Sequence, residues 1–195
     1  MVVPTARPPL TREAIVDAAR QITIVGGMEG LNMRRVASSL GVTAPALYAH
    51  VRHKSDLLQA IAEGELERLV EHFEQVHETD PVERVRRYAR IYVEQALEEP
   101  ELYQVLFLTQ PSLTLDQGDD LPIASKAFSL PATATIEAIE SGAFKPADPL
   151  MASLTMWTAV HGAATVLLMG LELDDASTDE LVTSVVETVI AGLSA

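Results

Sequence analysis

Apolar residues recur along most of the chain at the spacing of α-helices. In residues 11–27 they fall at every third or fourth position, which places them on one face of a helix. No segment alternates apolar and polar residues in the way that a half-buried strand does. The predicted helices cover residues 11–27, 33–40, 44–50, 54–76, 82–97, 101–108, 124–141, 151–171 and 179–193. The pattern predicts an all-α protein in which three short helices precede a larger helical body.

Capping residues and helix breakers place several of the helix ends. The expected N-caps of the first three helices are Thr11, Asn32 and Thr43. The Gly26-Gly27 pair and Gly41 are expected to end the first two helices, because glycine tolerates the left-handed conformation there. Pro131 is expected to interrupt the helix over 124–141, and residues 110–122 form a predicted loop.

Charge is distributed unevenly along the chain. The net charge of -14 by itself argues against a nucleic-acid partner. Residues 1–55, however, contain 7 Lys and Arg against 3 Asp and Glu, whereas residues 56–195 contain 7 against 25. A basic end on an acidic body suits a molecule that meets phosphates with one face. The chain has no cysteine, which excludes disulfides and thiolate metal sites.

The sequence contains neither a membrane signal nor the motifs of common enzymes. No run of 18 apolar residues occurs, and residues 1–10 lack the apolar stretch of a signal peptide. We therefore expect a cytoplasmic protein that does not bind membranes, with residues 1–9 as a flexible N-terminal arm. The zinc motif His-Glu-x-x-His, the phosphate loop and the Gly-x-Ser-x-Gly elbow are absent from the sequence. We expect no enzymatic activity, no catalytic or metal site and no cofactor.

Residues 33–52 have the spacing of a helix-turn-helix, a motif whose second helix lies in the major groove of DNA. The residues that can form a small core between its helices are Val36, Ala37, Leu40, Val42 and Leu47. The wider segment reads LTREAIVDAARQI and then GGMEGLNMRRVASSLGVTAPALYAHVRHKSDLLQAI. It resembles the DNA-binding domain of the TetR family of regulators.

The resemblance implies a division of labour along the chain. Residues 10–58 are expected to form the DNA-binding domain and residues 59–195 a helical domain for ligand binding and dimerisation. Such a chain is expected to be a homodimeric transcriptional repressor that a small-molecule effector releases from its operator. Tyr48 and Lys54 match family positions that contact phosphates, and so does Thr11 at the start of the first helix.

The predicted recognition helix is poor in residues that read bases. Between Thr43 and His50 there is no Arg, Asn or Gln, so the bidentate readers of guanine and adenine are missing. We expect small side chains to contact thymine methyls there, Arg34 to contact a base or a phosphate, and Arg7 to enter the minor groove. The candidate DNA-contacting residues are Thr11, Arg34, Thr43, Ala44, Pro45, Ala46, Tyr48, His50 and Lys54.

The resemblance also implies an apolar ligand pocket among the middle helices. The candidate ligand-contacting residues are Tyr88, Tyr92, Tyr103, Phe107, Phe128, Met151, Trp157 and His161. These residues can equally belong to the helical core. The acidic body leaves open a cationic ligand.

The last two predicted helices are the candidate dimer interface. Their candidate residues are Trp157, Val160, Ala163, Ala164, Val166, Leu167, Leu181, Val185, Val189 and Ile190. The same helices can instead close the core of a monomer. The alternative function is a helical module that binds small molecules or other proteins and does not bind DNA.

Overall fold

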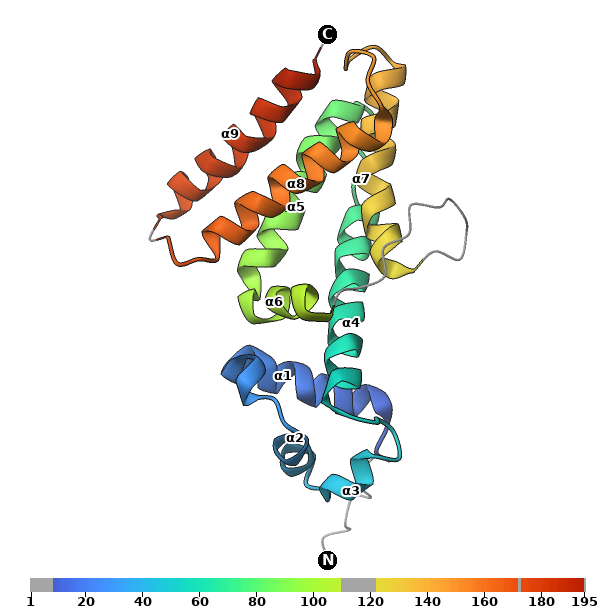
Figure 1. Cartoon of the computed structure of the whole chain (residues 1–195), viewed down its shortest axis with the longest axis vertical. Coiled ribbons are helices and arrows are strands. Elements are labelled where there is room, and N and C mark those ends of the chain that lie inside the picture. The colour runs from blue at the N-terminus through green and yellow to red at the C-terminus, as the bar shows by residue number, and fades with distance from the viewer. Residues whose placement is uncertain (1–8, 110–121, 172, 195) are drawn as a thin grey trace, which may run out of the picture. The chain divides into compact units, whose positions relative to one another are not determined.

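The computed structural model describes residues 9–109, 122–171 and 173–194, with the side chains of residues 107 and 108 excepted (Figure 1). The predicted arm, with Arg7, lies outside the described residues apart from Pro9, as does most of the predicted loop 110–122. The helices are α1 Arg12–Gly30, α2 Met33–Leu40, α3 Ala44–Leu47, α4 Lys54–Glu74, α5 Pro81–Glu98, α6 Pro100–Thr109, α7 Ile123–Glu140, α8 Pro149–Leu167 and α9 Asp175–Leu193. Within these residues the β-structure is limited to one isolated bridge between Phe144 and Ser194. The prediction of an all-α fold is confirmed.

The chain divides into two compact units. The first, called the head here, comprises Met1–Ala62 and Glu101–Gln110. The second, the body, comprises Glu63–Pro100 and Pro111–Ala195. All residues of α6 after its first, Pro100, therefore belong to the head, although the sequence division at residue 58 assigned them to the body.

The head has its own hydrophobic core. Its buried members are Ile15, Ala19, Leu31, Val36, Ala37, Leu47, Val51, Leu57, Ile61, Ala62, Leu102 and Val105. Of the residues predicted for the helix-turn-helix core, Val36, Ala37 and Leu47 are buried, while Leu40 and Val42 are partly buried against the same cluster. Since Leu102 and Val105 come from α6, this core joins segments far apart in the sequence.

The α1 helix changes direction where its glycine pair was predicted to end it. Gly27 has φ 61° and ψ -174°, a conformation that L-residues rarely adopt. Helical geometry resumes after Gly27 and continues to Gly30, so the predicted helix end is a kink followed by one more turn.

Local signals define α2 more completely than α3. Asn32 Oδ1 accepts the N–H of Arg35 at 3.0 Å, and Gly41 adopts the left-handed conformation at the other end of α2. Both predicted ends of this helix are confirmed. The helix predicted over 44–50 ends earlier, at Leu47, because the backbone N–H groups of Tyr48 and His50 form tighter three-residue turns. Thr43 precedes α3 without a side-chain capping bond.

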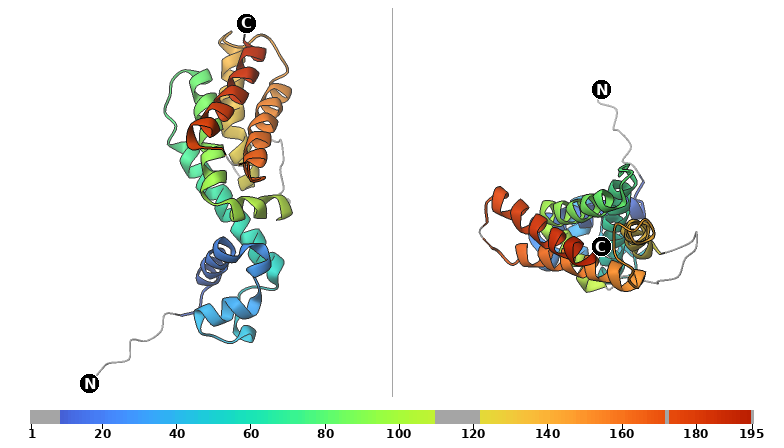
Figure 2. Two further views of the ribbon diagram at one scale, coloured as in Figure 1. Left: turned by 90° about the vertical axis from the view of Figure 1, so that its left-hand side faces the viewer. Right: turned by 90° about the horizontal axis from the view of Figure 1, so that it is seen from above.

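The body is a packed group of helices in which α8 contacts α5, α7 and α9, and α7 also contacts α5. Figures 1 and 2 show α8 and α9 running side by side. The predicted interruption at Pro131 is wrong, because α7 continues through this residue. Packing against α5 and α8 stabilises a helix in which proline removes one backbone donor. By length and composition, α8 is apolar enough to cross a membrane; 39% of this stretch is buried in the body, where α8 contacts α5, α7 and α9.

Aspartate side chains cap several helices of the body. Asp80 accepts the N–H groups of Val82 and Glu83 at the start of α5, and Asp148 accepts that of Met151 at the start of α8. Asp174 does the same for Ser177, so α9 begins at Asp175 rather than at the predicted residue 179.

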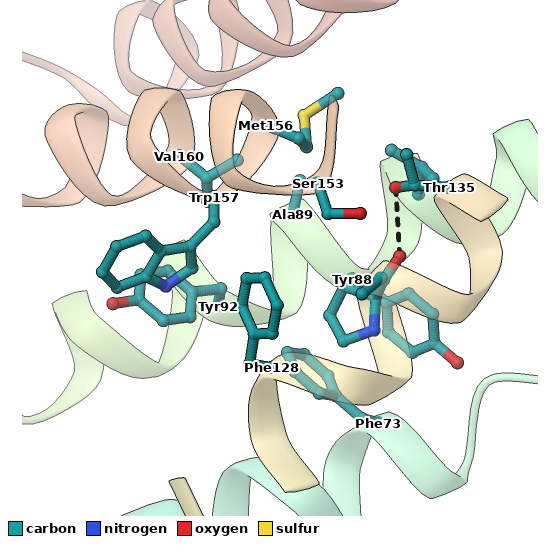
Figure 3. A pocket seen from close by; sticks show the side chains of 13 residues that line it. Phe73, Tyr88, Ala89, Tyr92, Phe128, Thr135, Ser153, Met156, Trp157 and Val160 are labelled. Carbon is teal, nitrogen blue, oxygen red and sulfur yellow. Dashed lines mark hydrogen bonds between the residues drawn. The ribbon is translucent and has the colours of Figure 1, made fainter. Parts of the chain in front are cut away.

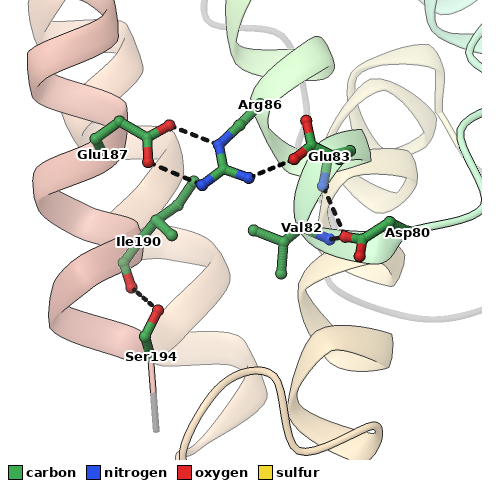
Figure 4. A network of polar contacts seen from close by, with 7 residues as sticks. All are labelled: Asp80, Val82, Glu83, Arg86, Glu187, Ile190 and Ser194. Atoms are coloured by element: carbon green, nitrogen blue, oxygen red, sulfur yellow. Dashed lines mark hydrogen bonds and ion pairs between the residues drawn. The ribbon is translucent and has the colours of Figure 1, made fainter.

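An ion pair between α5 and α9 predicts a pH-dependent contribution to stability (Figure 4). The guanidinium of Arg86 donates to both carboxylate oxygens of Glu187, at 2.6 and 2.8 Å. These hydrogen bonds lower the pKa of Glu187 below its ordinary value of 4.5. A carboxylate with a depressed folded-state pKa stabilises the fold above its unfolded pKa, and the contribution is lost as the pH falls through the folded value.

Glu187→Gln is therefore expected to lower the free energy of unfolding by about 0.5–1 kcal/mol at neutral pH, the range for a partly exposed pair. The difference from the parent protein should disappear in acid, below the folded-state pKa of Glu187. Urea unfolding at both pH values measures this. Glu180→Gln, on the exposed face of α9, is the matched control. An equal loss for E187Q at both pH values would show that the carboxylate charge is not responsible.

Candidate DNA-binding surface and ligand pocket

The segment around α3 presents its small and polar side chains to solvent. Leu47 is fully buried and anchors the helix, whereas the adjacent Tyr48 is 54% exposed. Thr43, Pro45 and His50 are also exposed. A large aromatic side chain that is solvent-exposed next to a buried anchor is placed to contact a partner rather than the core.

Two neighbouring arginines at the start of α2 have different surroundings. The guanidinium of Arg35 donates to the backbone carbonyl of Gly30 at 3.1 Å, which ties α2 to the end of α1. Arg34 is exposed and, within the described part of the chain, its side chain has no hydrogen bond or ion pair. Arg34 is therefore available to bind a phosphate or a base edge, whereas Arg35 has a structural contact.

The starts of α1 and α4 are held together by an ion pair. Arg12 Nη2 lies 3.2 Å from Asp56 Oδ1. The backbone N–H of Arg52 donates to the other oxygen of Asp56, and this bond, with the nearby Arg12 charge, lowers the pKa of the carboxyl. Thr11, next to Arg12 in the sequence, caps α1 by accepting the N–H of Ala14 at 3.2 Å.

Lys54 has a contact that sequence reasoning did not foresee. Its ammonium donates to the carbonyl of Met28 at 2.8 Å, next to the kink in α1. An ammonium carries three N–H donors, so this bond leaves others for a phosphate. Lys54 thus fixes the end of α1 as well as standing at the first position of α4.

His53 caps α4 in place of the usual serine, aspartate or asparagine. Its Nδ1 accepts the backbone N–H of Asp56 at 3.2 Å and lies 2.6 Å from Ser55 Oγ. The acceptor role requires Nδ1 to be unprotonated. The sequence signal for this cap is weak, because histidine is uncommon at such positions.

The body contains an apolar pocket between α4, α5, α7 and α8 (Figure 3). Its cavity volume is about 50 Å³, and the pocket opens in part to solvent. Its lining residues are Phe73, Val85, Tyr88, Ala89, Tyr92, Phe128, Pro131, Ala132, Thr135, Ser153, Met156, Trp157 and Val160. Apolar concave sites of this kind bind small molecules, but they typically measure roughly 300–1,000 Å³, so a ligand of ordinary size requires the wall side chains to move apart.

Aromatic side chains contact one another around this pocket. Phe73 and Tyr88 meet edge to face with ring centroids 4.9 Å apart, and Phe128 and Trp157 do so at 6.4 Å. His161 stacks on Trp157 at 5.0 Å, and its Nδ1 lies 2.6 Å from the Tyr92 hydroxyl oxygen. Burial lowers the pKa of His161, which favours its neutral form.

Both units match known family profiles. Residues 15–61, in the head, match the profile described as bacterial regulatory proteins of the tetR family. Residues 85–189 match the tetracyclin repressor-like C-terminal domain, a match that covers more than half of the chain. The chain belongs to the TetR family.

Individual proteins extend this assignment over the whole length of the TetR-family chain. An uncharacterised HTH-type transcriptional regulator of Mycobacterium tuberculosis is 28% identical over 190 residues, which are 96% of this chain and 84% of that protein. The tetracycline repressor protein class C of Escherichia coli is 49% identical over 57 residues, so the chain matches about a quarter of that repressor's length (26%). A solved structure of a Rhodococcus protein of unknown function aligns over 99% of this chain and 100% of its own, with a TM-score of 0.81 and 26% identity.

The TetR-family body brings together some of the predicted ligand residues and separates others. Tyr88, Tyr92, Phe128 and Trp157 line the pocket, and His161 contacts two of them. Tyr103 does not line this pocket and is buried in the head. Met151 is 53% exposed and does not line the pocket, and the side chain of Phe107 lies outside the described residues.

Sequence reasoning also missed several walls of the pocket and misplaced part of the candidate dimer face. Small residues such as Ala89, Ala132 and Ser153 line the pocket but have no sequence feature that separates them from core positions. Among the residues predicted for the dimer face, five are buried within the body. These five are Val160, Ala163, Ala164, Leu167 and Ile190.

Proposed function

We propose that this TetR-family protein is a cytoplasmic repressor that binds a two-fold symmetric operator as a homodimer and dissociates when an effector occupies the body pocket. The observation that carries the proposal is the exposed α2–α3 surface, where Tyr48 and Arg34 stand on the basic end of an acidic chain. Repression is favoured over activation because a compact dimer on a promoter obstructs polymerase without a further contact surface.

The proposed contacts divide into positioning and reading roles. Tyr48, Lys54 and Thr11 would hold phosphates, and such contacts fix the register without reading sequence. The small residues at the start of α3 would face the bases, with Thr43 and His50 supplying the polar groups. Because Thr43 to His50 contains no Arg, Asn or Gln, Arg34 would carry a larger share of recognition than the recognition helix itself.

Arg34→Ala is therefore expected to weaken operator binding by about 5- to 150-fold, the effect of losing one bidentate base contact of roughly 1–3 kcal/mol. Titration of labelled operator at several salt concentrations measures the loss. Its charge-matched control is Arg90→Ala in the body, whose arginine pairs with Asp179 on the body's surface. Operator affinity unchanged in R34A, or lowered equally in R90A, would remove Arg34 from the interface.

Homodimerisation is supported by the exposed face of α8 and its neighbourhood. Val166 and Met169, just after the end of α8, are 43% and 78% exposed, and the exposed Gly162 lies four positions before Val166 on the same side of the helix. Residues 146–195 contain no Lys or Arg, and α8 itself carries no charged residue. An uncharged helix face with exposed apolar side chains suits burial against a second copy.

The proposed release mechanism uses the continuity of α4. Lys54, its first residue, belongs to the head, while Phe73, near its end, lines the pocket in the body. An effector that binds one arrangement of this helix more tightly than another shifts the population of dimers that fit two half-sites. Linkage requires that operator DNA lower the effector affinity by the same factor.

Selection from random duplex DNA tests the proposal. The purified protein is equilibrated with the pool at low and at physiological salt, and the bound duplexes are sequenced. A two-fold symmetric motif with half-sites about one helical turn, 34–36 Å, apart is the expected result. Absence of enrichment at both salt concentrations would leave the alternative, a helical ligand-binding or interaction module. That alternative also predicts no steep salt dependence of DNA binding.

A further inference from the structure

We infer that the effector of this protein is an uncharged, mainly apolar molecule with a flat ring system, and that neither an anion nor a cation fits the site. That the bound molecule acts as an effector rests on the proposed function. The chemical class of the molecule concerns the body pocket alone and can be tested without DNA.

The walls of the pocket are unusually aromatic for this chain. The protein has four Phe, four Tyr and one Trp, and five of these residues line the pocket. They are Phe73, Tyr88, Tyr92, Phe128 and Trp157. Figure 3 shows the rings of Tyr92, Phe128 and Trp157 gathered on one side of the pocket, with Phe73 near Phe128. Because five aromatic side chains present ring faces and edges to the pocket, they favour a ligand that is itself flat and aromatic or polycyclic.

Three polar groups of the walls, those of Tyr92, Thr135 and Ser153, are hydrogen-bonded within the protein. Ser153 Oγ donates to the carbonyl of Pro149 at 2.7 Å, and Thr135 Oγ1 donates to that of Pro131 at 3.1 Å. The Tyr92 hydroxyl lies within hydrogen-bonding distance of His161. The Tyr88 hydroxyl and the Trp157 indole N–H have no hydrogen bond within the described residues, so the ligand gains dispersion and ring contacts together with hydrogen bonds to these two neutral groups.

The charges around the pocket exclude an anionic ligand. None of the thirteen residues that line it, as far as the structure describes them, is charged. Arg84, one turn before Tyr88 on α5, is paired with Glu137 of α7. The α8 wall belongs to a segment, residues 146–195, without any Lys or Arg, and burial favours neutral His161. A carboxylate or phosphate would lose its hydration without gaining a counter-charge.

A cationic ligand meets the opposite difficulty. The net charge of -14 attracts cations to the protein in general, and the aromatic faces can bind them. No Asp or Glu belongs to the lining within the described chain, however, so a cation in the pocket would lack a buried partner. The acidic residues of the body act at its surface, whereas the pocket walls select for an uncharged molecule.

A pair of dyes with one ring skeleton separates these classes. N-phenyl-1-naphthylamine is uncharged, and 8-anilinonaphthalene-1-sulfonate adds only a sulfonate; tetraphenylphosphonium supplies an aromatic cation. Trp157 is the only tryptophan and lines the pocket, so quenching of its fluorescence reports binding at the site directly. The uncharged dye is expected to bind at least ten-fold more tightly than the sulfonate and the phosphonium.

Two variants locate the binding. Ala132→Phe adds a ring to the pocket wall and is expected to weaken binding of the uncharged dye at least ten-fold. Thr133→Phe adds the same ring at the adjacent exposed position of α7 and should leave binding unchanged. Circular dichroism establishes that both variants keep their helix content. If A132F is unfolded, Ser153→Leu replaces it as the filling variant on α8.

Each outcome bears on the inference. Equal or tighter binding of the sulfonate or of the phosphonium overturns the ligand class. Binding of the uncharged dye that A132F and S153L leave unchanged overturns the assignment to this pocket, and so does a lack of binding. If the dye experiment fails but the selection from random DNA yields a symmetric operator, the proposed function stands and only the ligand class is overturned. If the uncharged dye binds as expected but no DNA motif is enriched, the ligand class is supported and the proposed function as a DNA-binding regulator is overturned.

Discussion

A Val166→Arg substitution is expected to convert the dimer into monomers and to lower operator affinity by at least two orders of magnitude. Val166 is 43% exposed on the uncharged face of α8. An arginine there would be buried without a partner if two copies pack through this face, since neither α8 helix contributes a carboxylate. An uncompensated buried charge costs about 3–5 kcal/mol, which corresponds to a dimerisation constant lowered by roughly 10²–10³ or more.

Analytical ultracentrifugation measures the dimerisation constant of V166R, and titration of the selected operator measures its affinity. A monomer engages one half-site and so loses most of the affinity of a symmetric reader. Thr133→Arg, at an exposed position of α7, adds the same charge elsewhere on the body and should remain dimeric. A dimeric V166R with normal operator binding would place the interface on another face, and dissociation of T133R would show that added charge alone disrupts the assembly.

A Leu47→Ala substitution is expected to unfold the helix-turn-helix and thereby abolish sequence-specific DNA binding. Leu47 is fully buried and is the only residue of the four-residue helix α3 in the buried core of the head. Truncating a buried leucine removes apolar contacts and leaves a cavity, at a cost of about 2–5 kcal/mol. A four-residue helix has too few hydrogen bonds of its own to persist without that anchor.

Urea unfolding followed by circular dichroism measures the loss of stability, and operator titration measures the loss of binding. Leu47→Met conserves volume and should cost less than about 1.5 kcal/mol. The substitution does not touch the proposed pocket, so L47A should still bind the uncharged dye. A stable L47A that binds operator normally would mean that α3 is held by contacts other than its buried leucine.

Helix ends set by local chemistry were predictable from the sequence. Asn32 and Gly41 fix α2 because a side-chain acceptor and a left-handed glycine act within one turn of the chain. One error arose where distant segments decide the outcome: Pro131 does not break α7 because α5 and α8 hold it. The other error is local, because α3 stops at Leu47 where tighter turns replace helical bonds.

The candidate sites show the same limit. Tyr48 was predicted as a phosphate contact from the resemblance of one segment, and Arg34 as a base or phosphate contact from its place at the start of the second helix; both predictions were possible because the motif is local. The pocket required knowledge of which helices are neighbours: Tyr88 and Tyr92 were anticipated, whereas Phe73 on α4 and the small residues of α7 and α8 were not. Tyr103 lies away from this pocket because α6 folds with the head, which the sequence gives no sign of.

The contribution of α6 to the head core bears on how such regulators can be recombined. Leu102 and Val105 are fully buried together with Ile15, Leu57 and Ile61, although some forty residues of the body separate the two segments in the sequence. Consider a chimera that joins this head to the regulatory domain of another protein at a single junction near residue 62. Such a chimera would lack Leu102 and Val105 and would expose the part of the head core that they cover. A chimera that keeps the head intact requires three junctions, because α6 must be retained with residues 1–62 and the foreign domain must replace the two body segments on either side of α6.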